Sequence, residues 1–341
     1  MARASEGVGR APSMTDVAAA AGVSHQTVSR VLNGSDLVRA DTRARVEAAI
    51  AELGYRRNNA ARLLVTNRSR RIGMISAHLV LHGPGMIAVS VQDAGHKAGY
   101  DVSLVAVEDF SSQSLREAVG RLLDEAVEAI VVAVAHREAL EQVRSLDAGV
   151  PIVVVQGVSA GQPMAVGIDQ EAGARLAVEH LLDLGHHHVA HVAGPQEWVE
   201  AGQRRAGWQR AHEERRVLPG PELAGDWSPK SGYEAGLRIA EEPDVTAVFA
   251  ANDSMAIGLM SALHAKGRDV PGEISVVGFD NMPEAPYLWP ALTTVDQEFS
   301  LLGRRAVELT LRALEGDLAP ATQLIRPGLV VRDSTAAPRL S

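Results

Sequence analysis

Four polar residues lie within a short stretch of the sequence, at a spacing that suits contact with the edges of base pairs. On a helix, His25, Gln26, Ser29 and Arg30 would share one face, because residues four apart lie side by side. A glutamine amide can bond N6 and N7 of adenine, and an arginine fork can bond O6 and N7 of guanine. A histidine can donate to a purine N7. The spacing therefore predicts a helix that reads bases in the major groove of DNA.

The residues before this helix predict how it is held. Ala20 and Ala21 are small enough for two helices to cross, and Gly22 suits the tight turn of a helix-turn-helix. Ser24 is a good cap for the second helix, which we expect to extend through Val31. The alternative is an ordinary helical hairpin with a polar outer face.

A third helix is expected from Asp41, as its cap, to Leu53, where Gly54 ends it. Its apolar residues repeat at helical spacing and would close a three-helix core. These residues are Val46, Ala49, Ile50 and Leu53.

Charge is divided unevenly along the chain. The net charge is −9, but residues 1–71 hold twelve arginines, no lysine and six acidic residues, which gives +6. The remainder holds 21 basic and 36 acidic residues, which gives −15. A basic first segment suits contact with DNA phosphates, although a solvated basic tail has the same charge.

From residue 72 onward, short apolar runs alternate with amphipathic stretches such as 170–184 and 253–266. Such runs fit strands buried on both faces, so the pattern predicts βαβ units and parallel sheets. Because the alternation is long for one sheet, we expect two doubly wound lobes with a cleft between them. The runs are 72–77, 102–107, 129–134, 152–155, 189–193, 247–250 and 274–279.

The composition argues against several kinds of chemistry. The chain has no cysteine, which removes disulfides, thiolate metal sites and thiol nucleophiles and fits a reducing cytoplasm. No long apolar run and no apolar leader is present, so we expect a cytoplasmic, nucleoid-associated protein with no membrane partner. No GxSxG, HExxH, phosphate-binding loop or dinucleotide fingerprint appears in a suitable context. We therefore predict no enzyme, no cofactor and no metal, the alternative being a metal site at His186, His187 and His188 with His191 nearby.

The stretches 15–18, 21–24, 27–33 and 42–46 resemble the headpiece of the LacI/GalR family of transcriptional regulators, and the likeness extends over nearly the whole chain. The resemblance implies an all-α helix-turn-helix headpiece followed by an α/β core. It also implies a hinge helix whose leucine, Leu64, wedges into the minor groove. Arg57 departs from the proline that is usual there. By position, the DNA contacts are His25, Gln26, Thr27, Ser29, Arg30, Asn33, Asn58, Ala61 and Leu64.

The same resemblance suggests how the chain is divided. We expect a disordered leader at 1–12, the headpiece at 13–57 and the hinge and linker at 58–71. A two-lobed core of the periplasmic-binding-protein type I would follow at 72–335. Lobe one would take about 72–168 and 299–326, and lobe two about 169–298 and 327–335.

The core of this family binds a small effector, often a sugar, between its lobes. Sugar sites need planar polar groups for paired hydroxyls and an aromatic face for the ring. Gln156, Trp198 and Glu200 depart from a lactose-responsive member of the family, and Trp198 adds a second stacking surface. His82 and Glu284 are candidates for a latch between the lobes. The predicted effector residues are Leu81, Ile87, Gln156, Trp198, Arg204, Trp227, Asn252, Asp280, Gln297 and Phe299.

We therefore predict a homodimeric repressor that binds a pseudo-palindromic double-stranded operator and is released by a galactoside or other small saccharide. The absence of leucine heptads near Ser341 argues against a larger assembly through a coiled coil. One alternative is a corepressor mechanism with a purine or phosphorylated ligand. A sugar transport binding protein is the alternative from another class.

Overall fold

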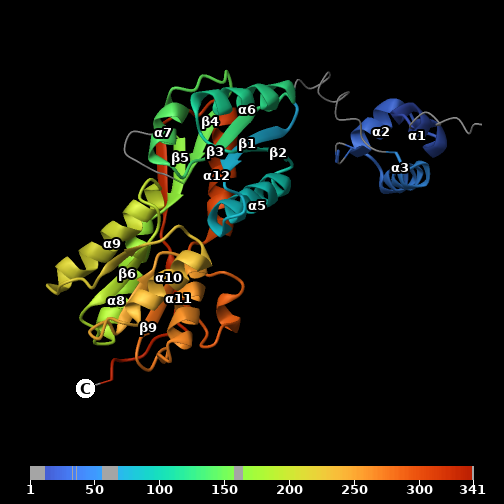
Figure 1. The fold of residues 1–341 in the computed structure, drawn as a ribbon. Helices are drawn as coiled ribbons and strands as arrows, with labels where there is room; N and C mark the ends of the chain where they lie inside the picture. The colour runs from blue at the N-terminus through green and yellow to red at the C-terminus, as the bar shows by residue number, and fades with distance from the viewer. Residues whose placement is uncertain (1–11, 33, 36, 56–67, 157–163, 340–341) are drawn as a thin grey trace, which may run out of the picture. The chain divides into compact units, whose positions relative to one another are not determined.

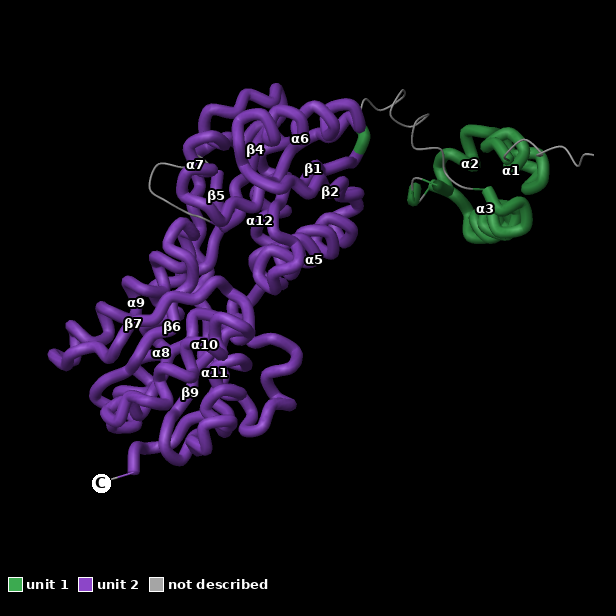
Figure 2. The backbone as a smooth tube through the Cα atoms, viewed as in Figure 1, with its two compact units in different colours: residues 1–69 green, residues 70–341 purple. Residues whose placement is uncertain are grey.

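A computed structural model describes residues 12–32, 34–35, 37–55, 68–156 and 164–339 and divides the chain into two units. Figure 2 shows residues 1–69 as the first unit and residues 70–341 as the second. The predicted leader and hinge lie largely outside the described residues. So do five residues with predicted roles: Asn33, Arg57, Asn58, Ala61 and Leu64.

Among its described residues, the first unit contains three helices (Figure 1): α1 (Met14–Ala21), α2 (His25–Leu32) and α3 (Ala40–Leu53). Ser13 caps α1 and forms a capping box with Asp16, whose carboxylate accepts from the Ser13 backbone N–H. Gly22 ends α1 with a left-handed φ of 64°, which a glycine adopts without steric cost. Ser24 begins α2, its Oγ accepting from the Thr27 N–H over 3.2 Å, as predicted.

The apolar faces of these helices meet in one small core. Val17, Val28 and Val46 are fully buried there, and Ala49 packs beside them. Two local predictions were wrong. Asp41 is not the cap of α3, which begins at Ala40 after Arg39 and has no side-chain cap bond. Ala20 is exposed, because the helical phase turns Ala18 and Ala21 inward instead.

The second unit begins with a six-stranded parallel sheet, which we call lobe one with its helices. Its strand order is β11-β5-β4-β3-β1-β2. Helices α5 (His82–Lys97) and α12 (Phe299–Leu314) pack on one face, and α6 (Ser112–Asp124) and α7 (Arg137–Arg144) on the other (Figure 1). The strands are β1 (Arg71–Ala77), β2 (Asp101–Val107), β3 (Ala129–Ala133), β4 (Ile152–Val155), β5 (Met164–Ile168) and β11 (Ala321–Ile325).

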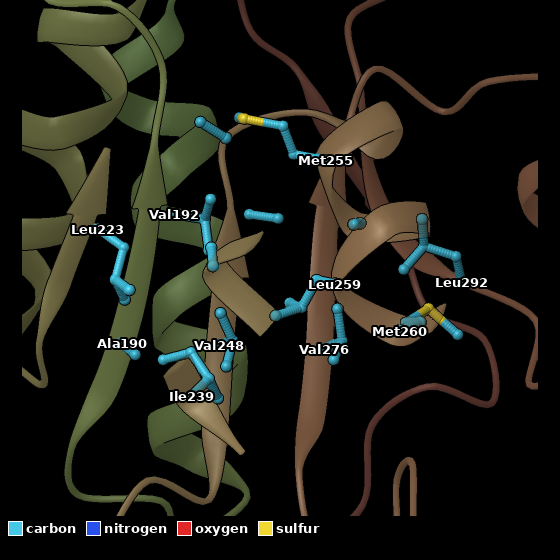
Figure 3. Packing of buried hydrophobic residues seen from close by; sticks show 14 of the residues in the cluster. Ala190, Val192, Leu223, Ile239, Val248, Met255, Leu259, Met260, Val276 and Leu292 are labelled. Carbon is cyan, nitrogen blue, oxygen red and sulfur yellow. The ribbon is translucent and has the colours of Figure 1, made fainter. Parts of the chain in front are cut away.

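Lobe two is built on a second sheet, in the order β12-β10-β9-β8-β6-β7. Helices α8 (Gln170–Asp183) and α9 (Val199–Arg215) cover one face, and α10 (Pro229–Ile239) and α11 (Asp253–Ala265) the other. Figure 3 shows side chains of the strands packed against those of α10 and α11. The strands are β6 (Val189–Ala193), β7 (Glu222–Ala224), β8 (Ala247–Ala250), β9 (Ser275–Phe279), β10 (Thr293–Asp296) and β12 (Gly328–Val330), with a 3-10 turn η1 (Ala285–Tyr287).

The chain crosses between the lobes at three places. It passes from β5 to α8, from β10 to α12 and from β11 to β12. At the last crossing no helix lies between β11 and β12, so the chain runs straight from the cleft into lobe two as a strand. For this reason β12 pairs antiparallel with β10. No helix in the described part of the chain is long and apolar enough to span a membrane.

Candidate functional site

The second helix of the first unit presents a polar face to solvent. His25, Gln26 and Arg30 are exposed on α2, whereas Val28 and Val31 on its other side are buried in the core. Ser29 is half-buried. Thr27 is half-buried too, and its hydroxyl is engaged with Ser24 Oγ at 2.9 Å, so it contributes to the helix cap. The exposed set is thus narrower than the predicted one.

A cavity of about 40 Å³ lies between the two lobes, at the carboxyl ends of their strands. Ile87 and Phe299, both predicted for this site, are instead buried in the core of lobe one. The ring of Phe299 contacts that of His82, with centroids 5.9 Å apart. Eight predicted residues line the cavity: Leu81, Gln156, Trp198, Arg204, Trp227, Asn252, Asp280 and Gln297. His82, Gly83, Pro84 and Glu200 line it as well.

Asp280 is a buried carboxylate on the lobe-two wall of this cavity. Gln297 donates from Nε2 to Asp280 Oδ1 over 2.6 Å, and Arg204 Nη1 lies 3.7 Å from the same oxygen. Burial raises the pKa of Asp280, while the charge of Arg204 opposes that rise. The Asp280 carboxylate can accept hydrogen bonds in a site from which water is largely excluded.

Arg204 is held on several sides. It donates from Nε to Gln170 Oε1 over 2.8 Å and from Nη1 to the Ala251 carbonyl. Its guanidinium carbon lies 3.8 Å from the centre of the Phe279 ring, within cation–π range. These contacts use Nε, Nη1 and the face of the group. Gln170 was not among the predicted residues.

Trp227 supplies the aromatic surface of the cavity. Its ring lies 5.5 Å from the Arg204 guanidinium carbon and edge-on to Trp198, with centroids 5.8 Å apart. Among the described residues, its buried Nε1 has no hydrogen-bonding partner. The ring fits only because residue 194 is glycine, since a Cβ there would lie 2.2 Å from Trp227 Cη2. A buried donor at the wall of a cavity suits a ligand with acceptor oxygens.

Asn252 and Asp253 lie at the start of α11, beside the cavity. Asn252 caps α11, since its Oδ1 accepts from the Met255 N–H over 2.8 Å. Its Nδ2 donates to the Trp227 carbonyl over 3.1 Å, so Asn252 also fixes the backbone of that tryptophan. Asp253 is fully buried and accepts from Thr294 Oγ1 over 2.5 Å. Burial, together with the Asp280 charge, raises the pKa of Asp253 to about 8.

Three residues that line the cavity have a positive φ: Gln156 (63°), Trp227 (72°) and Asp280 (117°). Such conformations cost on the order of 1–3 kcal/mol each for residues other than glycine. They follow β4, β7 and β9, where the chain bends sharply away from the strand. The strain is therefore concentrated where side chains are aimed into the cavity.

The histidines at 186–188 do not assemble a metal site. His186 bonds to Thr246 and to the Ala336 carbonyl, and His191 is stacked on Phe249 at 4.9 Å. In the described part of the chain, no cluster of three metal-binding side chains is found. The suggested latch is not formed either, because no ion pair joins His82 to Glu284 among these residues.

Comparison with known proteins gives these features a context. Residues 13–58 match the bacterial regulatory proteins of the lacI family, and residues 178–335 match the periplasmic binding protein-like domain. The chain is 37% identical over 327 residues to the lactose operon repressor of Escherichia coli K12, covering 95% of this chain and 90% of that repressor. The chain belongs to the LacI family.

This LacI-family protein is also 34% identical to the regulator CelR of Thermobifida fusca, over 95% of this chain and 98% of CelR. A crystal structure of the lac repressor dimer bound to operator and the anti-inducer ONPF matches with a TM-score of 0.81 and 36% identity, over 96% of this chain and all of that chain. A CelR–cellobiose complex matches with a TM-score of 0.70 and 32% identity, over 95% of this chain and 99% of that chain. The predicted family and fold class are confirmed. The protein is a DNA-binding transcriptional regulator and not an enzyme.

Proposed function

We propose that this LacI-family protein represses transcription by binding a pseudo-palindromic operator as a homodimer. Support comes from the face of α2, where His25, Gln26 and Arg30 are exposed with the donors and acceptors that base edges require. The related lac repressor was crystallised as a dimer on its operator. Asn58, Ala61 and Leu64 stay predicted hinge contacts. Operator binding would place the protein at the nucleoid, in the cytoplasm.

The effector that we propose is a neutral saccharide bound in the cleft. The observation that carries this proposal is the group of Arg204, Asp280 and Gln297 on the same cavity wall as the Trp227 ring. The polar groups offer donors and acceptors for neighbouring hydroxyls, and the indole offers an apolar face for ring C–H groups. The relatives bind ligands of this kind, since CelR was crystallised with cellobiose and the lac repressor with ONPG.

The charges of the cleft argue against a phosphorylated corepressor. Arg204 faces Asp280, and the carboxylate of Glu200 lines the same cavity. A phosphate placed here would meet two carboxylates and a cation that is already paired, which is unfavourable in a desolvated site. We therefore favour the inducer over a phosphorylated corepressor, and the screen described below includes a purine.

The position of the cavity bears on how a ligand acts. The residues that line it come from both lobes, with Gly83 and Gln156 in lobe one and Asp280 in lobe two, so a ligand held there contacts both lobes. Ligand binding is then coupled to the separation of the lobes. Because the ligand shifts the balance between lobe arrangements by its differential affinity, it can release the operator.

Trp198 argues for a saccharide of more than one ring. One side of its indole meets Trp227, and it also contacts His78 and His136, at 5.3 and 4.9 Å between ring centroids. These two histidines line a second cavity of about 630 Å³ on lobe one. A second sugar unit stacked on Trp198 would extend toward that space.

A thermal-shift screen tests the effector class. Galactose, glucose, lactose, cellobiose, guanine and glucose 6-phosphate are added to the full chain, and a ligand at one hundred times its Kd stabilises the native state by about 2.7 kcal/mol. An operator is selected from a pool of random duplexes, and its affinity is measured with and without each ligand that binds. We expect a neutral saccharide to raise the melting temperature and weaken operator binding. A purine or sugar phosphate that tightens operator binding would establish the corepressor mechanism instead.

A further inference from the structure

Gln170 lies at the first crossing between the lobes. It is the first residue of α8 in lobe two and follows β5, a strand of the lobe-one sheet, by two positions. Its neighbour Asp169 donates its backbone N–H to the Ile325 carbonyl over 2.9 Å, at the start of the third crossing. Any rotation of one lobe against the other must pass through these segments.

Gln297 lies at the second crossing, between β10 of lobe two and α12, which packs on lobe one. Gln170 donates from Nε2 to Gln297 Oε1 over 2.8 Å. Both side chains are almost fully buried, at 2% and 1% exposed. A buried amide that loses its partner costs about 1–3 kcal/mol, so this bond ties two crossings together firmly.

The side-chain amides of Gln170 and Gln297 also bond to two residues that line the cleft. Gln170 accepts from Arg204 Nε at 2.8 Å through its Oε1, while Gln297 donates to Asp280 Oδ1 at 2.6 Å through its Nε2. Arg204 and Asp280 approach to 3.7 Å and complete a ring of four side chains. Arg204, Asp280 and Gln297 line the cavity, whereas Gln170 does not. Gln170 thus lies behind the groups proposed to bind the saccharide. Its Nε2 donates to Gln297 at the second crossing, and its Oε1 accepts from Arg204.

We propose that Gln170 is a positioning residue that transmits saccharide binding from Arg204 and Asp280 to the crossings, and so to lobe one. A primary amide suits this position because it offers an acceptor to Arg204 and a donor to Gln297 at once. When a ligand draws Arg204 or Asp280 toward itself, the ring passes the displacement to both crossings together. The inference rests on the proposed effector function and adds the residue through which that function is coupled to DNA.

Two substitutions separate the halves of the ring. Gln170→Glu keeps an acceptor for Arg204 and removes the donor to Gln297, whereas Gln170→Leu removes both. Gln203→Leu, on α9 and outside the ring, is the matched control. For each full-length protein, three quantities are measured: the Kd for lactose and cellobiose, the operator affinity without saccharide, and the factor by which saturating saccharide weakens operator binding.

We expect Gln170→Glu to bind the saccharide within about threefold of the parent and to bind the operator equally well, while the weakening factor falls at least about fivefold, within the usual range of allosteric coupling. Gln170→Leu should lose the same coupling and bind the saccharide more weakly as well. A purely structural role would lower the melting temperature of both variants and leave the factor unchanged, which overturns the inference. If neither saccharide binds the parent protein, the proposed effector class fails first, and the inference falls with it.

Discussion

The indole of Trp198 stands edge-on to that of Trp227, with 5.8 Å between ring centroids and an interplanar angle of 73°. This is a favourable geometry for an aromatic pair. Because Trp198 also contacts His136, an aromatic surface extends from the cleft toward lobe one. On the proposed function, a ligand with one ring would contact Trp227 alone, and a longer ligand would contact both indoles.

Replacing Trp198 by Ala should therefore weaken the binding of a disaccharide more than that of a monosaccharide. Aromatic stacking is worth about 0.5–1.5 kcal/mol beyond area burial, so affinity for a disaccharide should fall at least about three- to tenfold. Affinity for the matching monosaccharide should change less than twofold. Isothermal titration of cellobiose and glucose, or of lactose and galactose, measures both.

The control is Trp289→Ala, which removes a tryptophan that is 98% exposed and does not line the cleft. It should leave both affinities unchanged. If Trp198→Ala lowers the affinity for the monosaccharide and the disaccharide by the same factor, Trp198 only supports the cavity wall.

Asp280→Asn should weaken saccharide binding without weakening operator binding. Charge-assisted hydrogen bonds are worth about 1.5–3 kcal/mol, against about 1 for neutral ones, and the new amide turns one acceptor into a donor. We expect a loss of roughly ten- to a thousandfold in saccharide affinity. A reporter strain should then stay repressed at saccharide levels that release the parent protein.

The control for this variant is Asp183→Asn, which changes an exposed carboxylate of lobe two that pairs with Arg215. It should respond to saccharide like the parent. A normal response from Asp280→Asn, or a loss of operator binding in the absence of sugar, would show that Asp280 has a structural role instead.

Arg30→Ala should lower the discrimination between operator and random DNA by roughly five- to 150-fold. A bidentate arginine contact supplies about 1–3 kcal/mol of discrimination, and Arg30 is exposed, so no core packing is lost. Arg45→Ala removes the same charge from an exposed position on α3 and is the matched control. Competition gel shifts should show reduced specificity for the first variant and, for the second, at most an equal weakening on all sequences.

Much of this architecture follows from local sequence patterns. Strands buried on both faces read as continuous apolar runs, and seven runs were predicted as strands, among them 152–155 and 189–193. Six of these strands are buried along most of their length, whereas β2, at a sheet edge, is exposed or half-buried. Other strands are short or interrupted. β5 contains Gly167 and β11 alternates between exposed and covered positions at a sheet edge, so neither gives a strong apolar signal.

Two residues of the cleft were predictable because polar residues follow recognisable strands. Asp280 comes directly after β9 and Asn252 two residues after the end of β8, and the structure brings both to the cavity. Arg204, Trp227 and Gln297 line it too, and they were predicted by resemblance. Gln170 follows the unpredicted β5, so no local pattern marked it. Ile87 and Phe299 were placed by resemblance, and their helical phase points them into the core of lobe one, which a linear sequence does not reveal.

The buried carboxyl of Asp253 makes stability depend on pH. With its pKa raised to about 8, the folded chain keeps a proton that the unfolded chain, with an ordinary aspartate pKa near ~3.9, releases. Unfolding thus releases a proton between these values, and stability falls as the pH rises through this range, by up to about 1.4 kcal/mol per pH unit. Above the folded pKa, the loss is complete.

The buried histidines make stability fall as the pH is lowered, which is opposite to the effect of Asp253. They therefore limit the pH range in which the effect of Asp253 can be measured. Burial lowers the pKa of His191 to about 4, so protons taken up by the unfolded chain below about 6.5 destabilise the fold in acid. Between about pH 6.5 and 8, Asp253 therefore dominates, because its pKa in the folded chain lies near the upper end of this range. Asp253→Asn cannot ionise, so its free energy of unfolding should change markedly less across this window than that of the parent protein. Urea unfolding at four pH values measures both slopes, and parallel slopes would show that Asp253 is ionised in the folded chain throughout.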